Sequence, residues 1–189
     1  MKKKLGEIPV SVLDLATIIE GETPSHSFIK SLEMARHAEN QAEETLTKLC
    51  EKYDALEIKS SYYLSRALYQ LGNLASRRGE YKQAIALFDR AMQVGNALST
   101  DEILTLMIDK SQALRSLGEF DQAMLTLSFV INYHAVSALR LKAMLLRAEI
   151  YHAQGRVTLA RKQLESLALK GGEWALRAKE KLAQEYAYE

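Results

Sequence analysis

Two amphipathic helical patterns that meet at Gly79 constrain the fold of this chain more than any other feature. On each side of Gly79, apolar residues recur three and four positions apart, the spacing that places them on one face of a helix. Glycine suits the junction because it lacks a Cβ and adopts the positive φ with which many helices end. Residues 67–91 therefore predict two antiparallel helices packed against each other. Their apolar faces are made of Leu68, Leu71, Leu74 and Ala75 in the first helix, and of Tyr81, Ala84, Ile85, Phe88 and Ala91 in the second.

The same pattern recurs around Gly118 and Gly155. A single hairpin cannot bury its apolar face alone, so stacked neighbours must supply the missing surface. The many helix-forming residues and the presence of only two prolines agree with an all-α array of hairpins. A small residue at one position of each first helix lets the two helices of a hairpin approach closely. Aligned on the three glycines, these small residues are Gly72, Ser111 and Ala148.

These hairpins resemble the tetratricopeptide repeat, which has a period of about 34 residues and one helical hairpin per repeat. The resemblance covers residues 61–169 and implies three hairpins, within residues 59–170, stacked into a right-handed solenoid. Ser99 to Glu102 supply N-cap residues for the second hairpin. The linkers between hairpins are longer than in the family, and no proline closes the repeats. The sequence therefore constrains each hairpin more tightly than the geometry between hairpins.

Segments on both sides of the hairpins complete the predicted organisation. Residues 1–24 are expected to be extended, because the run from Ile8 to Ile19 is β-branched and apolar. Residues 25–58 predict either one long helix or a helix pair that breaks at Asn40-Gln41. Residues 171–189 predict a C-terminal capping helix. Its apolar side is expected to contain Trp174, Leu176, Ala178, Leu182 and Tyr186.

The N-terminal segment carries a second resemblance. The run from Ile8 to Ala16, the turn from Glu20 to Pro24 and the helical stretch from Ser31 to Glu39 resemble the first strand and helix of bacterial luciferase-like flavin-dependent monooxygenases. The resemblance covers residues 8–39. Since a (β/α)8 barrel needs about 250 residues, it implies no working enzyme of this kind and leaves a fusion, a fragment or chance as its explanation. One strand leaves its backbone groups unpaired, so we expect residues 1–20 to be loosely held, remodelled or paired with another chain.

The sequence contains no recognisable catalytic or cofactor motif. Its four histidines form no HExxH pattern and lie at no metal-ligand spacing with Cys50. It has no phosphate-binding glycine loop and no nucleophile elbow. Cys50 reads as a small apolar residue of a helix, because no histidine or basic residue is placed beside it. We therefore predict that the protein is not an enzyme and binds no cofactor or metal.

The composition also limits the classes of partner. A net charge of +1 gives no general attraction to nucleic acid, and no window approaches the roughly 20 apolar residues of a membrane span. The basic start from Met1 to Lys4 is not followed by the clean apolar run of a signal peptide. A lone cysteine fits a reducing compartment. We expect a cytoplasmic protein that binds neither nucleic acid nor membranes.

Stacking in the manner of the tetratricopeptide repeat implies that the first helix of each hairpin lines a concave groove. The side chains expected there are polar, aromatic and aliphatic, a mixture suited to a peptide that is read by pockets along the groove. The alternative is a solvated trough that binds no peptide. The predicted groove residues are Arg66, Tyr69, Asn73 and Ser76 in the first hairpin, Thr105, Ile108, Gln112 and Arg115 in the second, and Lys142, Leu145, Glu149 and His152 in the third.

Some members of the family hold the C-terminal carboxylate of chaperone tails with five basic and amide residues. Only two of the corresponding residues, Asn73 and Lys142, match that clamp in type, and Asp109 would repel a carboxylate. The sequence therefore argues against this clamp. The five corresponding residues are Tyr69, Asn73, Asp109, Lys142 and Leu146.

The sequence thus predicts a non-catalytic protein-interaction module, an adaptor, scaffold or chaperone-like protein that binds a peptide segment in its groove and that can also self-associate. Three helix pairs resemble the secretion chaperones of type III systems as well, although those are acidic and this chain is nearly neutral. Two alternatives stay open. The chain could be a purely structural oligomerisation unit, or the remnant of a flavin-dependent luciferase-like oxidoreductase.

Overall fold

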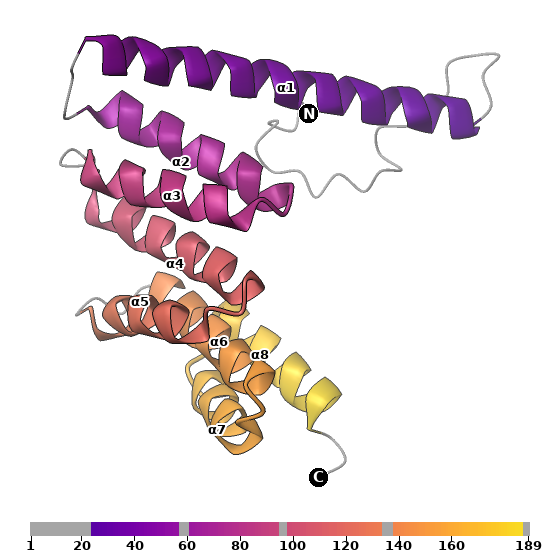
Figure 1. Cartoon of the computed structure of the whole chain (residues 1–189). Coiled ribbons are helices and arrows are strands. Elements are labelled where there is room, and N and C mark those ends of the chain that lie inside the picture. Colours follow the sequence, from indigo (N-terminus) through magenta and orange to yellow (C-terminus); the bar gives the residue numbers. More distant parts are fainter. Residues whose placement is uncertain (1–23, 57–60, 95–97, 134–137, 187–189) are drawn as a thin grey trace. The chain divides into compact units, whose positions relative to one another are not determined.

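The computed structural model describes residues 24–56, 61–94, 98–133 and 138–186, with side chains described from residue 36 onward. Within these ranges the chain forms eight α-helices and no strand, which confirms the all-α prediction (Figure 1). The run from Ile8 to Ile19, and the expectation of a loosely held N-terminus, lie outside the described residues. The helices are α1 (Pro24–Ala55), α2 (Tyr62–Arg77), α3 (Tyr81–Gln93), α4 (Thr100–Ser116), α5 (Phe120–Asn132), α6 (Ala138–Ala153), α7 (Val157–Ala168) and α8 (Gly172–Glu185).

Helix α1 runs without interruption through Asn40 and Gln41, so the structure contains one long helix here and not a helix pair. The chain divides into two compact units, and the division falls within α1. The first unit ends at Lys48 and the second begins at Leu49. In the first unit, the described side chains from Arg36 onward are exposed or half-buried.

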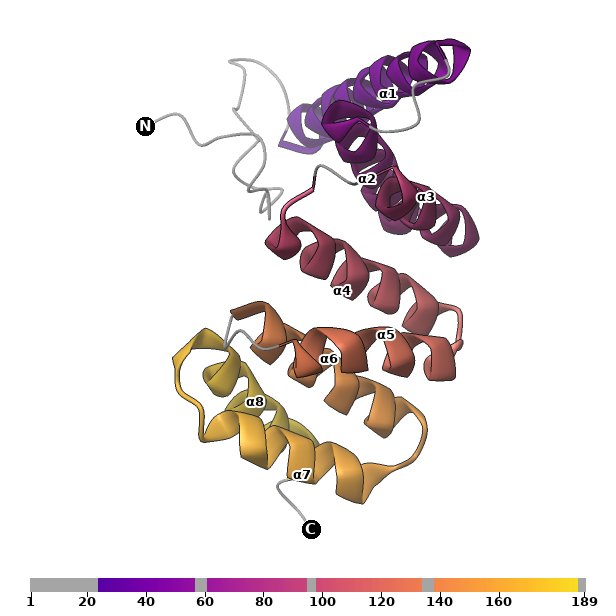
Figure 2. The same ribbon diagram turned by 90° about the vertical axis from the view of Figure 1, so that its left-hand side faces the viewer.

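Helices α2 to α8 form three hairpins followed by a final helix. Within the hairpins α2 packs against α3, α4 against α5, and α6 against α7. Each second helix also packs against the first helix of the next hairpin, and α7 packs in this way against α8. The first helices contact one another in turn, α2 with α4, α4 with α6, and α6 with α8. Figures 1 and 2 show helices α2 to α8 following one another along the array in chain order. The predicted array of stacked antiparallel hairpins is confirmed, and α8 takes the place of a fourth first helix.

The turns of the three hairpins share one backbone structure. Gly79, Gly118 and Gly155 have φ values of +80°, +78° and +72°, which strain residues that carry a Cβ. The Gly79 amide donates to the carbonyl three residues earlier at 3.1 Å, and the next amide donates to the carbonyl five residues earlier at 2.9 Å. The same two bonds occur in the other turns. They satisfy carbonyls at the end of each first helix, as the glycine alignment predicts.

The two helices of each hairpin pack with residues of complementary size at the positions of Gly72 and Phe88. A Cβ added to Gly72 would lie 2.6 Å from Cε1 of Phe88, so the aromatic ring of α3 rests directly on the backbone of α2. The other two hairpins have a slightly larger residue at the Gly72 position and a smaller one at the Phe88 position. All of these residues are buried. The equivalent pairs are Ser111 with Leu127, and Ala148 with Leu164.

Helix α8 extends the hydrophobic core. Ala178 and Tyr186 are buried in the same cluster as residues of α4 to α7, and Trp174 is partly buried against it. The prediction that Leu176 belongs to the apolar side is wrong, because its side chain is 61% exposed. Ala175 is buried instead, since its spacing of three from Ala178 puts both residues on the side of α8 that faces the core.

Candidate functional site

Most of the predicted groove residues meet on one side of the array. They come from α2, α4 and α6, and most of them form bonds between neighbouring first helices. We call this surface, together with the adjoining side of α8, the first-helix face. The predicted residues that are half-buried or exposed there are Arg66, Tyr69, Asn73 and Ser76 of α2, Thr105, Gln112 and Arg115 of α4, and Lys142, Glu149 and His152 of α6.

Ile108 and Leu145 do not contribute to the first-helix face. Ile108 is 0% exposed and Leu145 is 7% exposed, and both belong to the hydrophobic core. The sequence suggested them because they occupy the position of Tyr69 when the repeats are aligned on their glycines. In α4 the residue that reaches the neighbouring first helices is Asp109, one position further along. We therefore remove Ile108 and Leu145 from the predicted groove, since core side chains cannot contact a peptide.

Asp109 connects three first helices. The Tyr69 hydroxyl of α2 donates to Oδ2 of Asp109 at 2.6 Å, and Nζ of Lys142 on α6 donates to Oδ1 at 3.4 Å. Burial, together with the hydrogen bond to Asp109, raises the pKa of Tyr69 to about 12, and a hydrogen bond with Asn73 acts in the opposite direction. Tyr69 therefore stays protonated and acts as a fixed hydrogen-bond donor at neutral pH.

Glu102 forms a second link between α2 and α4. Its carboxylate accepts hydrogen bonds from the Tyr62 hydroxyl and from Nη1 of Arg66, both at 3.1 Å. The same carboxylate completes the capping box of α4, because Oε2 accepts the Ser99 amide at 2.9 Å. The backbone hydrogen bond from Ser99 is the largest cause of a lowered Glu102 pKa. This confirms the predicted N-cap and shows that Glu102 also faces the preceding hairpin.

Glu149 links the C-terminal half of the array. It forms an ion pair with Arg115 of α4 and another, at 3.1 Å, with Lys181 of α8. Burial acts to lower the pKa of Lys181, but the hydrogen bond and charge of Glu149, together with Glu185, raise it overall. Lys181 therefore stays charged, and α4, α6 and α8 are held together by paired charges.

His152 closes this end of the first-helix face. Its Nδ1 lies 2.9 Å from the hydroxyl oxygen of Tyr186 and 3.6 Å from Oε2 of Glu185. The ring of Tyr186 is almost fully buried, so the residue that follows α8 is anchored to α6. His152 thus forms a polar contact within the protein at a position where the sequence predicts a groove residue.

We call these contacts, centred on Glu102, Asp109, Glu149 and Glu185, the cross-repeat network. Sequence reasoning placed the cations of α2, α4 and α6 and the carboxylate of Glu149 on the first-helix face, but it missed Glu102, Asp109 and all of α8. A usable signal was present. Asp109 stands directly beside the predicted groove position Ile108 in α4, where a carboxylate can meet the cations of neighbouring first helices.

The network also bears on the carboxylate clamp considered from the sequence. Asp109 shares its charge with Lys142 and accepts the Tyr69 hydroxyl, so the one matching lysine already has an anionic partner. Leu146 is 7% exposed and lies in the core. These positions therefore form contacts between repeats, which agrees with the rejection of the clamp.

The described residues offer no group of side chains suited to holding a metal ion. Cys50 is buried, and burial raises the pKa of its thiol, which disfavours the thiolate needed for nucleophilic chemistry. Across the described part of the chain, no helix combines the length and the apolar character needed to cross a bilayer.

Comparison with known proteins agrees with the repeat architecture. Residues 63–127 match a family model described as tetratricopeptide repeat, and residues 141–166 match a second model with the same description. A comparison with curated proteins found no match. The resemblance of residues 8–39 to luciferase-like monooxygenases has no support among these matches, and most of that segment precedes the described side chains.

Two solved structures share the fold. Both contain nearly identical tetratricopeptide-like repeats of a protein from Podosopora anserina assigned as a kinesin light chain. One of them, a variant with a glutamine replaced by methionine, is 18% identical, with a TM-score of 0.62 over 90% of this chain and 83% of the other. The second is also 18% identical, with a TM-score of 0.60 over 92% of this chain and 84% of the other. At this identity the likeness establishes the fold alone.

Proposed function

Because the chain is built of tetratricopeptide-type repeats, we propose that it is a non-catalytic protein-interaction module, an adaptor, scaffold or chaperone-like protein, that binds a peptide segment across the first-helix face. Its partner would be a protein. The predicted location in the cytoplasm rests on the sequence and stays a prediction.

The cross-repeat network is the observation that carries this proposal. It fixes side chains of α2, α4, α6 and α8 at defined positions before any partner binds. Side chains that are already ordered lose little conformational freedom on binding, so more of the contact energy contributes to affinity.

The charges of the network indicate which peptides suit the face. Cations and carboxylates are equal in number, so the face gives no net attraction to a strongly acidic or strongly basic segment. Asn73 and Gln112 carry amides, each with donor and acceptor groups that can pair with a peptide backbone. We therefore expect a partner segment of low net charge, and an affinity that depends weakly on salt. The charged members are Arg66, Arg115, Lys142 and Lys181, with Glu102, Asp109, Glu149 and Glu185.

Affinity capture with two matched double variants tests this assignment. The test variant carries Asn73→Ala and Gln112→Ala, which leave the charges of the network intact. The control carries Gln83→Ala and Gln122→Ala, at exposed and equivalent positions of α3 and α5. Partners identified by mass spectrometry with the unmodified chain should be lost with the test variant and recovered with the control. Titration of a peptide from that partner then measures the change in Kd.

Equal recovery of the same partners by both variants would show that the first-helix face is not the binding surface. Thermal unfolding of both variants checks that each remains folded. The flavin-enzyme alternative has a separate test. Purified protein whose flavin absorbance survives dialysis would contradict the proposal of a non-catalytic module.

A further inference from the structure

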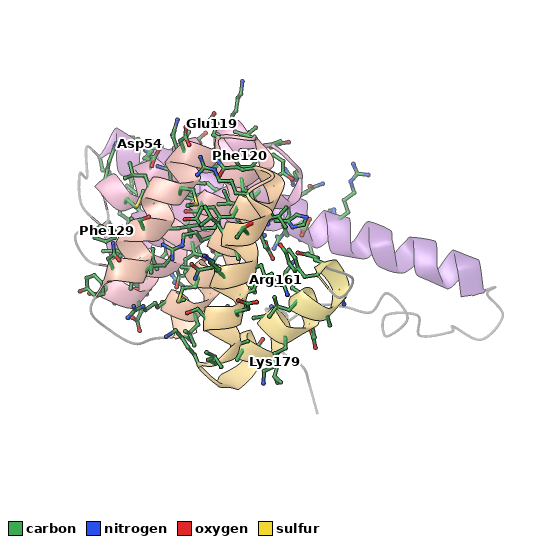
Figure 3. The ribbon with its side chains drawn as sticks, turned by 90° about the horizontal axis from the view of Figure 1, so that it is seen from below. Asp54, Glu119, Phe120, Phe129, Arg161 and Lys179 are labelled. Carbon is green, nitrogen blue, oxygen red and sulfur yellow. The ribbon has the colours of Figure 1, made fainter. Side chains whose placement is uncertain are left out.

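The side of α5 that faces away from the core is apolar. Leu125 is 76% exposed, Phe129 56% and Tyr133 39%, and the ring centroids of Phe129 and Tyr133 lie 6.3 Å apart. These residues recur every four positions, so they are neighbours on the surface. Phe129 lies on the outer side of the helix (Figure 3). Single exposed apolar residues are ordinary on a protein surface, whereas a contiguous group of them is typical of a surface that binds a protein.

The other second helices have different residues at these places. Counted from the turn glycines, the place of Phe129 is taken by Arg90 in α3 and by Ser166 in α7, and the place of Leu125 is taken by Lys162 in α7. These helices pack in hairpins of the same kind, so a hairpin does not depend on apolar residues here. The apolar surface is a property of α5 alone among the three second helices.

The exposed residues of α5 and its C-cap form a set that is symmetric about position 127. Six residues between positions 120 and 133, a range that the structure describes in full, are exposed. Reversing the helix about position 127 exchanges them in pairs, 121 with 133, 122 with 132, and 125 with 129. A two-fold interface requires a surface of this kind, because the same patch of both copies meets there. We call the six residues the α5 face: Asp121, Gln122, Leu125, Phe129, Asn132 and Tyr133.

We propose that the α5 face pairs in antiparallel orientation with the α5 face of a second copy of this chain. Leu125 of each copy then lies against Phe129 of the other at the centre of the interface. Gln122 lies against Asn132, and each of these amides has donor and acceptor groups for the other. The pairing buries the apolar centre of the face and surrounds it with polar groups, the usual arrangement of a protein interface.

The charge of the α5 face favours a second copy in this orientation. Asp121 is the one charged residue among the six. Antiparallel pairing places its carboxylate opposite the hydroxyl of Tyr133 in the other copy, which can donate a hydrogen bond to it. The two carboxylates are then about 18 Å apart along the helix axis, beyond the Debye length of about 10 Å at 0.1 M salt. A parallel pair in register would place each carboxylate against its own copy, where like charges repel.

The size of the α5 face indicates a weak dimer. Six residues are fewer than the roughly 20 that each partner contributes to a standard interface. We therefore expect a Kd in the micromolar range, so that monomer and dimer exchange. Polar contacts at the rim contribute little, and Gln122→Ala should leave the dimer intact. The pairing is independent of the proposed peptide binding, which uses the first helices.

Sedimentation velocity of the full chain, from low to high micromolar concentration, tests the pairing. The mass of the unmodified chain should rise from 21.3 kDa toward twice that value. Leu125→Asp should stay at the monomer mass, with the dimer Kd raised at least tenfold, because it places a charge in the apolar centre. Leu159→Asp makes the same change at an exposed position of α7 and should dimerise like the unmodified chain. Circular dichroism checks that both variants are folded.

A spin label at Glu119→Cys, in a Cys50→Ala background, tests the orientation. The label lies eight positions from the two-fold centre at 127, which places the two labels of an antiparallel pair about 24 Å apart along the helix axis. A parallel pair would bring them to about 10 Å, close to the spacing between packed helix axes. A distance near the shorter value overturns the antiparallel pairing.

Three mass results would overturn the pairing itself. They are a monomeric unmodified chain at every concentration, a Leu125→Asp variant that dimerises like the unmodified chain, and equal dissociation by Leu159→Asp. If the chain is monomeric and Leu125→Asp lowers the thermal midpoint more than Leu159→Asp, another segment of the same chain covers the α5 face. If the chain is monomeric and only Leu125→Asp loses captured proteins, the face belongs to a different protein partner.

Discussion

The contact between Gly72 and Phe88 shows how single residues set the fit of a hairpin. The buried ring of Phe88 fills the space that a side chain at position 72 would occupy. The other two hairpins have a larger residue on the first helix and a leucine on the second, and these residues are buried as well. A larger residue on one helix is therefore matched by a smaller residue on the other, and the effect of a substitution at either position depends on both.

Gly72→Ala should destabilise the array despite the higher helix propensity of alanine. Overpacking costs about 1–3 kcal/mol, and alanine recovers about 1 kcal/mol of helix propensity, so we expect a net loss of about 1 kcal/mol. The Phe88 ring cannot turn aside because it is fully buried. Urea unfolding measures the change. In a Phe88→Leu background the same substitution should be neutral or stabilising, and an equal loss in both backgrounds would contradict the volume argument.

At the scale of elements, α4 is the helix whose beginning the sequence defines best. The capping box between Ser99 and Glu102 satisfies amides that would otherwise have no partner at the helix N-terminus. The Glu102 carboxylate also accepts bonds from α2. The start of α4 is thus joined to the preceding hairpin by the residue that caps it.

Ser99→Ala should lower the free energy of unfolding by about 1 kcal/mol, the usual cost of losing an N-cap side chain. Ser99→Asp keeps an acceptor at the cap and serves as the conservative control, although it places a second carboxylate near Glu102. Thermal unfolding followed by circular dichroism measures both. A Ser99→Ala variant as stable as the unmodified chain would show that the capping box does not contribute to the free energy of unfolding.

At the scale of the whole molecule, the cross-repeat network determines which first helices are linked by polar contacts. The apolar core joins each hairpin to the next, and Asp109 adds a link that spans three hairpins at once. The stability of a repeat array depends on the interactions between neighbouring hairpins as well as on the intrinsic stability of each hairpin.

Asp109→Ala should destabilise the array by about 1–2 kcal/mol, because Tyr69 and Lys142 lose their shared acceptor while part of the loss is recovered by water. Asp109→Asn, which keeps a hydrogen-bond acceptor but not the charge, should fall between this variant and the unmodified chain. Asp121→Ala, an exposed acidic residue of α5, is the control and should stay within about 0.5 kcal/mol. Equal urea midpoints for Asp109→Ala and Asp121→Ala would show that the network does not contribute to the stability of the array.

The sequence located the hairpins well because their signals are local. Gly79, Gly118 and Gly155 end helices by a backbone conformation that depends on the residue itself. The spacing of apolar residues then defines which side of each helix is buried. Leu176 shows the limit of this reasoning, since an apolar residue one position from the buried line of α8 stays exposed.

The tertiary structure decided which residues of the first helices lie on the first-helix face. Tyr69, Ile108 and Leu145 occupy the same place in the aligned repeats, yet Tyr69 bonds to Asp109 while the other two are buried. The rotation of each first helix against its neighbours sets this outcome, and it depends on packing between residues far apart in the chain. The sequence by itself determined the hairpins and their order. Only the packed array decided the exposed face and the pairing of its charges, because helix formation is local whereas side-chain exposure depends on the neighbouring repeats.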